Sequence, residues 1–179
     1  MTALPAKRHA RDLRRSALPA VLALMLAACG SGTDTGAIRD SDARISSQVN
    51  VTADRLAGNW HIRTRWPGTP NPAGPLRLVQ SAQTLTLTGT ATNGPVTTTL
   101  TPLGQGRFRA GNSQAFGDSP LWVLWMDADN RTAAIGTPDG RFGWIMDRAP
   151  TGGADRITAA REIMEWMGYD LSLSKETSQ

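Results

Sequence analysis

Eight short apolar or alternating runs, separated by turn sequences, occupy about a hundred residues between Val51 and Pro150. Turns this short leave no room for the crossover helices that parallel strands require, so neighbouring runs are expected to pair antiparallel. An open sheet would leave two edges exposed, whereas a closed barrel has none. The sequence therefore predicts an all-β fold, an eight-stranded antiparallel up-and-down β-barrel. The runs are at residues 58–66, 75–81, 83–91, 96–103, 106–111, 121–126, 132–136 and 141–146.

The first run, GNWHIRTRW, alternates with a period of two. One face carries Trp60, Ile62, Thr64 and Trp66, and the other carries polar and basic side chains. This alternation is typical of a half-buried strand, because a helix would scatter the aromatic residues around its axis. We expect both tryptophans to point into the barrel.

The period changes after Pro150. Apolar residues recur at helical spacing over residues 155–168, and Gly168 stands where a helix would end. We expect one C-terminal α-helix, packed against the outside of the barrel, and a barrel domain that spans residues 51–179. A methionine-rich partner surface is the alternative interpretation of the apolar stripe.

The start of the chain is typical of a secreted protein. Residues 1–28 combine a basic beginning with an apolar run too short to span a bilayer, and are expected to be a signal peptide. The following residue, Cys29, is the chain's sole cysteine, and the sequence LAAC before and including it resembles a bacterial lipobox. That resemblance implies lipidation of Cys29. Because Gly30 is not aspartate, it also implies the periplasmic side of the outer membrane. Residues 29–50 are rich in Gly, Ser, Thr and Asp, which predicts a flexible tether.

The charge balance argues against nucleic acid as a partner. The leader holds five of the 19 Lys and Arg residues and one of the 15 Asp and Glu residues, so 14 of each sign remain. The net charge of +4 therefore belongs to the leader, and no basic cluster is left to bind phosphates.

Catalytic chemistry has little support. After the leader, His61 is the sole histidine, which is too few for a typical zinc site or a Ser-His-Asp arrangement. Asp127, Asp129 and Asp139 lie in turn sequences that favour aspartate for backbone reasons. The glycines around residue 140 lie between two strands, not before a helix as a phosphate loop requires. We expect no enzyme activity, no metal and no cofactor.

Three segments together resemble the lipocalin family. RLAGNWHIRTR (55–65) is similar to its Gly-x-Trp opening, and MDADNRTAAIGTPDGRFGWIMDRAP (126–150) to its later motifs in bacterial, apolipoprotein D-like members. The tail from Thr151 resembles that group's closing helix. The resemblance implies that Gly58 and Trp60 belong to the barrel floor, with Arg148 against the Trp60 ring. Asn130 departs from the tyrosine common in relatives, and the middle strands are short and rich in threonine.

The resemblance implies a membrane-anchored protein that binds a small hydrophobic ligand, with fatty acids or lysophospholipids favoured. A barrel filled by its own side chains, acting as an envelope scaffold, is the alternative, and weak hydrolase or isomerase activity through His61 is a third. The sequence does not fix the oligomeric state. The residues expected to line the ligand site are Ile62, Thr64, Trp66, Leu76, Leu78, Leu85, Leu87, Phe108, Val123, Trp125, Phe142 and Trp144.

Overall fold

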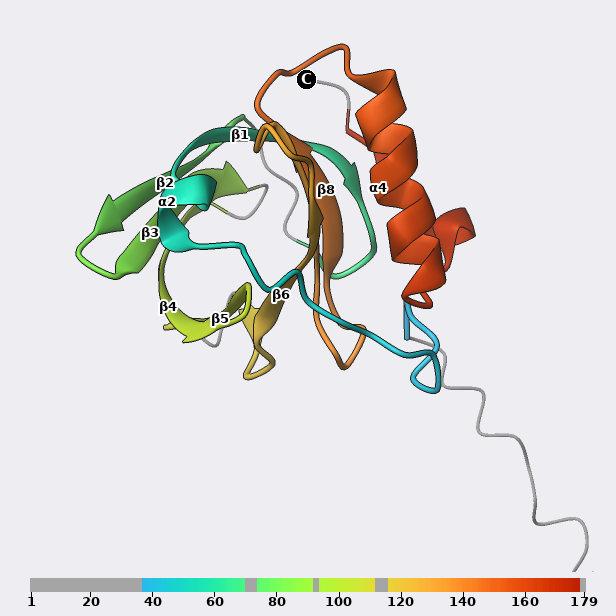
Figure 1. The fold of residues 1–179 in the computed structure, drawn as a ribbon. Coiled ribbons are helices and arrows are strands. Elements are labelled where there is room, and N and C mark those ends of the chain that lie inside the picture. Colours follow the sequence, from blue (N-terminus) through green and yellow to red (C-terminus); the bar gives the residue numbers. More distant parts are fainter. Residues whose placement is uncertain (1–36, 70–73, 92–93, 112–115, 178–179) are drawn as a thin grey trace, which may run out of the picture. The chain divides into compact units, whose positions relative to one another are not determined.

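The computed structural model describes residues 37–69, 74–91, 94–111 and 116–177. Eight antiparallel strands follow one another around a barrel, and a helix of 13 residues lies beside it (Figure 1). Both features confirm the predicted fold. The elements are α2 (Ala53–Leu56), β1 (Gly58–Arg65), β2 (Leu76–Ser81), β3 (Thr84–Ala91), β4 (Gly94–Gly104), β5 (Arg107–Ala110), β6 (Leu121–Met126), β7 (Thr132–Gly136), β8 (Gly143–Asp147), α4 (Ala154–Trp166), a 3-10 turn at Leu171–Leu173 and β9 (Lys175–Glu176).

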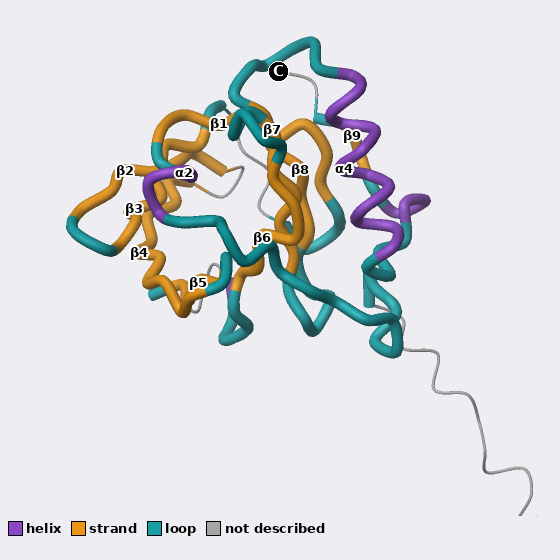
Figure 2. The backbone as a smooth tube through the Cα atoms, viewed as in Figure 1, coloured by secondary structure: helices purple, strands orange, loops and turns teal. Residues whose placement is uncertain are grey.

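The barrel closes because β1 has two neighbours. Each strand from β2 to β7 pairs with the next in the chain, and β1 pairs antiparallel with both β8 and β2. The short β9 adds to the far end of β1, at Thr64 and Arg65. The tube view in Figure 2 shows the strands arranged around one interior, with α4 to one side. A single apolar core fills this interior.

A β-bulge divides β1 into two parts that face differently. The pairing with β8 is regular up to Ile62 opposite Met146, and resumes with Thr64 opposite Ile145. The extra residue reverses which face each later side chain occupies. Trp60 and Ile62 therefore point into the barrel, whereas Thr64 points outward.

Helix α4 covers the outside of the barrel wall, as the sequence predicted. Its end is a Schellman motif: the backbone N–H of Gly168 donates to Glu165 (2.8 Å), and that of Tyr169 donates to Met164 (3.0 Å). Gly168 has a φ of +90°, a conformation that glycine adopts readily. A second apolar cluster fills the space between helix and barrel, and its buried members are Ile38, Trp66, Leu124, Ala134, Ile145, Ala160, Met164 and Tyr169.

Residues 37–50 are bound to the barrel domain, so the predicted flexible tether is wrong for this part of it. The segment passes from the C-terminal end of α4 across β6 to α2 (Figure 1). Ile38 is buried, and the Arg39 side chain donates to the carbonyls of Met167 (2.6 Å) and Pro138 (3.1 Å). Gln48 donates to Val123 of β6 through its backbone N–H. Turn-forming composition alone did not reveal these anchoring side chains.

The expected signal peptide and Cys29 lie outside the described residues. Residues 36–179 form one compact unit. Within the described ranges, no helix combines the length and the apolar character needed to cross a membrane.

Candidate functional site in the barrel interior

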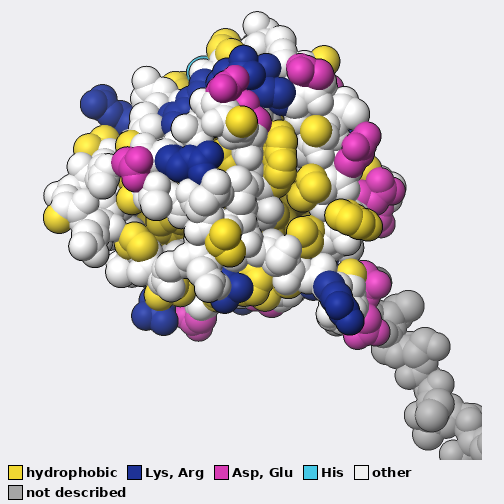
Figure 3. Space-filling view, viewed as in Figure 1, with side chains coloured by type: hydrophobic (Ala, Val, Ile, Leu, Met, Phe, Trp, Pro, Cys, Tyr) yellow, Lys and Arg dark blue, Asp and Glu magenta, His cyan; other side chains and the backbone are white. Residues whose placement is uncertain are grey.

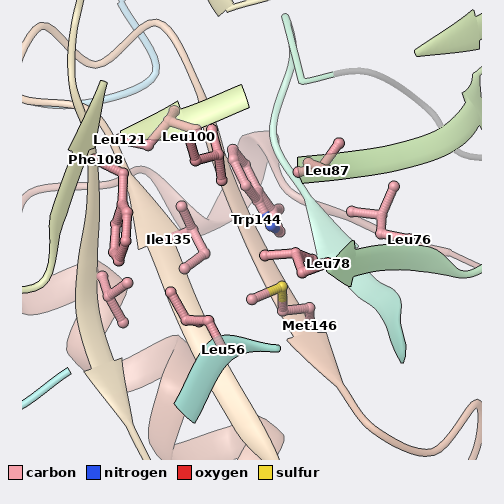
Figure 4. Close-up of a pocket in the computed structure, with 11 residues that line it drawn as sticks. Leu56, Leu76, Leu78, Leu87, Leu100, Phe108, Leu121, Ile135, Trp144 and Met146 are labelled. Carbon is pink, nitrogen blue, oxygen red and sulfur yellow. The ribbon is translucent and has the colours of Figure 1, made fainter. Parts of the chain in front are cut away.

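An apolar cavity lies inside the barrel and takes side chains from α2 and from every strand between β2 and β8. Figure 4 shows these side chains directed toward one another from the surrounding strands. Alternate residues of each strand supply them, because successive side chains of a strand point to opposite faces. The lining residues are Leu56, Leu76, Leu78, Leu87, Leu100, Phe108, Leu121, Val123, Ile135, Trp144 and Met146.

The cavity is small. Its volume is about 20 Å³, enough for about one water molecule. Pockets that bind small molecules usually measure about 300–1,000 Å³. A larger ligand can therefore enter this interior only if side chains of the lining move.

One polar atom is buried among these apolar side chains. Trp144 is 3% exposed, and its indole Nε1 is buried with no hydrogen-bond partner among the described residues. In Figure 4 the nitrogen lies on the side of the ring that faces the other labelled residues, near Leu78. A buried N–H without an acceptor is unusual, since most such groups are satisfied in folded proteins.

Trp60 and Arg148 close one end of the barrel, as the resemblance implied. The Arg148 guanidinium lies over the Trp60 ring, 3.6 Å from its centroid, and its nitrogens donate to the carbonyls of Arg55, Asn59 and Asn130. The Trp60 Nε1 donates to the Leu56 carbonyl (2.7 Å). Gly58 leaves room for Arg148, because a Cβ at residue 58 would lie 2.6 Å from Nη1. We call this group, Gly58, Trp60 and Arg148, the barrel floor.

Aromatic side chains occupy the end of the barrel opposite the floor. We call this end the open end, because the barrel floor does not close it. Strand β8 runs from this end toward the floor, and Phe142 precedes it. The Phe142 ring lies 6.0 Å from that of Phe116, which lies 6.1 Å from the Trp144 ring. Phe116 and Phe142 therefore stand between the cavity and the open end.

A tyrosine outside the barrel fixes the β7–β8 turn at this same end. The Tyr169 hydroxyl accepts from the backbone N–H of Thr137 (2.8 Å) and lies 3.0 Å from the Phe142 carbonyl, to which it can donate. Burial raises the pKa of Tyr169 to about 12. The neutral phenol is thus part of the packing between α4 and the barrel.

The structure places nine of the twelve predicted lining residues inside the barrel. Ile62, Leu85 and Phe142 belong to the interior core without lining the cavity. Their role in binding stays a prediction. The six that line the cavity are Leu76, Leu78, Leu87, Phe108, Val123 and Trp144.

The inward orientation predicted for the other three is wrong. Trp66 is fully buried outside the barrel, where its Nε1 donates to the Asp170 carbonyl (2.7 Å) and its ring meets Tyr169 edge-on. Thr64 lines a groove between β1 and the start of α4. Trp125 packs against the outer cluster. Bulges after Ile62 and after Val123 reverse the alternation on which these predictions depended.

Five lining residues escaped the sequence prediction: Leu56, Leu100, Leu121, Ile135 and Met146. Three carried a usable signal, because Leu100 alternates with exposed threonines in its run, Leu121 shares its phase with Val123 and Met146 shares its phase with Trp144. Ile135 stands in a run that is buried on both faces, so alternation gave no phase. Leu56 reaches the cavity from the short helix α2, which has no strand phase.

The sequence also raised two other kinds of site, a metal site and one built around His61. No group of three or more His, Cys, Asp or Glu side chains in them is placed to hold a metal ion. His61 lies on the outward phase of β1, opposite Asp147 in the pairing with β8.

Comparison with known proteins supports the fold. Residues 107–179 match the family model of the lipocalin-like domain. This part of the chain is therefore similar to lipocalins. No curated protein matches the sequence.

Solved lipocalin structures share the architecture at low sequence identity. Apocrustacyanin C2 superposes with a TM-score of 0.57 at 15% identity, over 80% of this chain and 89% of its own. Lobster apocrustacyanin A1 gives 0.54 at 16%, over 70% and 78%. The cockroach allergen Per a 4 gives 0.57 at 12%, over 78% and 96%. At such identities the likeness shows the fold alone.

Proposed function

We propose that this protein binds a slender hydrophobic molecule in its barrel interior and is held at the cell envelope by a lipid on Cys29. The apolar lining of the cavity carries the proposal. Removing apolar surface from water favours binding by about 25 cal/mol per Å², so such a lining selects an acyl or similar chain. Fatty acids and lysophospholipids are the ligand classes we favour, with the polar group toward the open end.

The interior must widen to accept such a chain. The barrel wall has one place where two neighbouring strands pair over a short length, which we call the seam. Strand β5 pairs with β6 at two residue positions, whereas β3 pairs with β4 at seven. Phe108 and Leu121 flank this seam and line the cavity. Met146 and the leucines have flexible side chains that adapt to irregular volumes. We infer that the β5–β6 wall separates slightly when the ligand enters.

Tryptophan emission tests binding, because Trp144 lines the cavity. The chain from Gly30 onward is titrated with lysophospholipid and with palmitate. We expect a saturable change that disappears in Trp144→Phe.

Leu78→Trp fills the cavity and should abolish binding. Val79→Trp, on the exposed face of the same strand, should leave binding unchanged. Thermal unfolding identifies any variant that does not fold.

The scaffold function is the second candidate, and the small volume of the cavity favours it. If the barrel is permanently filled, neither the wild type nor Met146→Ala, which enlarges the interior, will bind any of these molecules. A ligand bound only by Met146→Ala would also contradict a carrier function of the natural chain.

A further inference from the structure

We infer that the ligand of this barrel carries a neutral hydrogen-bond acceptor, such as an ester or ketone oxygen, that reaches the Trp144 indole N–H. This inference rests on the proposed function and specifies the ligand class of the same site. It starts from the orphaned Nε1 of a side chain that is 97% buried on the cavity wall.

In the part of the chain that the structure describes, this donor has no hydrogen-bond partner. The other described lining residues are Leu, Ile, Val, Phe and Met, none of which offers a strong acceptor. Leaving a buried donor unsatisfied is unfavourable, so an occupant that brings an acceptor is preferred over a pure hydrocarbon.

A water molecule is a poor substitute for that acceptor. The cavity volume of about 20 Å³ would admit one, but a buried water normally makes about three hydrogen bonds. Here Trp144 is the one side chain of the lining with a hydrogen-bonding group. A ligand oxygen attached to an apolar chain needs only this single donor, and its chain fills the remaining space.

A charged acceptor is disfavoured at this depth. No charged side chain is among the eleven described residues that line the cavity. An ionised carboxylate buried there would lose its hydration without a compensating cation. Beside Trp144 the site therefore favours an ester or ketone over the carboxylate of a free fatty acid, which would have to stay at the open end.

The test compares three nine-carbon molecules, nonane, 2-nonanone and nonanoate, by displacement of the fluorescent probe N-phenyl-1-naphthylamine. Trp144→Phe keeps an aromatic side chain, with a smaller ring, and removes the donor. We expect this variant to bind 2-nonanone about tenfold more weakly than the wild type does. Its affinity for nonane should stay within about twofold of the wild-type value. Trp122→Phe is the matched control, because Trp122 also has a buried, unpartnered Nε1 but lies on the outer face of β6. It should change neither affinity.

The NMR signals of the indole N–H groups give a second readout. It uses the wild-type protein, so it does not depend on the folding of Trp144→Phe. In the ¹⁵N-labelled wild type, 2-nonanone should shift the Trp144 Nε1–H signal downfield and nonane should not. Equal shifts, or an unchanged 2-nonanone affinity in Trp144→Phe, would overturn the inference while leaving the carrier function intact. If none of the three molecules displaces the probe from any variant, the proposed function itself fails.

Discussion

Single side chains at the barrel floor are held by close steric fits. Gly58 has a φ of +112°, and Arg148 occupies the space where a Cβ would stand. Asn130 has a φ of +57°, and its side chain accepts from Arg55 (2.7 Å). Asparagine tolerates this left-handed conformation better than the tyrosine of relatives would. The floor thus depends on backbone conformation as much as on the indole itself.

Gly58→Ala tests this fit. The new methyl group would displace Arg148 from the Trp60 ring and strain the backbone, so we expect the free energy of unfolding to fall by about 2–4 kcal/mol. Urea denaturation measures it. Gly74→Ala is the control, since a Cβ there meets nothing within 4 Å. Equal stability of the two variants would contradict the role assigned to Gly58.

Tyr169 is the chain's one tyrosine, so its ionisation can be measured directly. Its pKa of about 12 lies above the ordinary value of 10.0, chiefly because of burial. The stability that the neutral phenol contributes is therefore complete below pH 10 and is lost as the pH rises through about 12. Tyrosinate absorbance should have a midpoint near 12 in the native protein and near 10 in denaturant. A native midpoint near 10 would mean that the phenol is accessible to water.

At the scale of elements, a buried ion pair joins helix α4 to the barrel. Asp147 of β8 is 1% exposed and accepts from the Arg156 side chain (3.1 Å), from Thr132 and from the Ala149 N–H (2.8 Å). Burial alone would raise the pKa of Asp147, but these hydrogen bonds and the Arg156 charge together lower it below 3.8. The ion pair between Arg156 and Asp147 thus holds the beginning of α4 against the barrel, and Tyr169 holds the chain just beyond its end.

Arg156→Ala should weaken this attachment in a pH-dependent way. At pH 7 we expect a loss of about 2 kcal/mol, below the full cost of breaking a buried pair because Arg156 is partly exposed. The stabilisation is present above the unfolded pKa of about 3.9 and is lost as the pH falls through the lower folded pKa. The difference between variant and wild type in urea denaturation should therefore shrink by pH 3. In Arg161→Ala, which loses a hydrogen bond to Ser174 instead, a similar pH-dependent difference would contradict this assignment.

The elements themselves were largely predictable, because each strand carries its own alternation and each turn its own chemistry. Whether a side chain points into or out of the barrel was predictable only where its strand has no bulge. One inserted residue in β1 moved Trp66 from the expected cavity to the helix interface, and another in β6 moved Trp125. A bulge depends on pairing with a neighbouring strand, and the sequence of one strand does not reveal it. The volume of the interior depends on how eleven side chains from many elements pack, which no local pattern encodes.

At the scale of the whole molecule, the bound segment 37–50 begins at the open end of the barrel. Arg39 contacts Pro138 in the β7–β8 turn, at this end. The described residues that follow the proposed lipid site in the sequence are therefore bound at the end where we propose that the polar group of the ligand lies.

Cys29→Ser tests the proposed anchor. We expect the variant to move from the membrane fraction to the soluble envelope fraction and to lose incorporation of labelled palmitate. Ser31→Ala, beside the same site, should behave as the wild type does. Membrane association that persists in Cys29→Ser would contradict lipid anchoring through this residue.

Native mass spectrometry of the full-length protein, gently extracted from its own membrane, shows whether the barrel carries a ligand. We expect one non-covalent apolar molecule per chain, with an uncharged oxygen function, that is absent from Leu78→Trp and retained by Val79→Trp. Wild-type protein that is free of any such molecule, and that takes up none when lipids are added, would show that the barrel is filled by its own side chains.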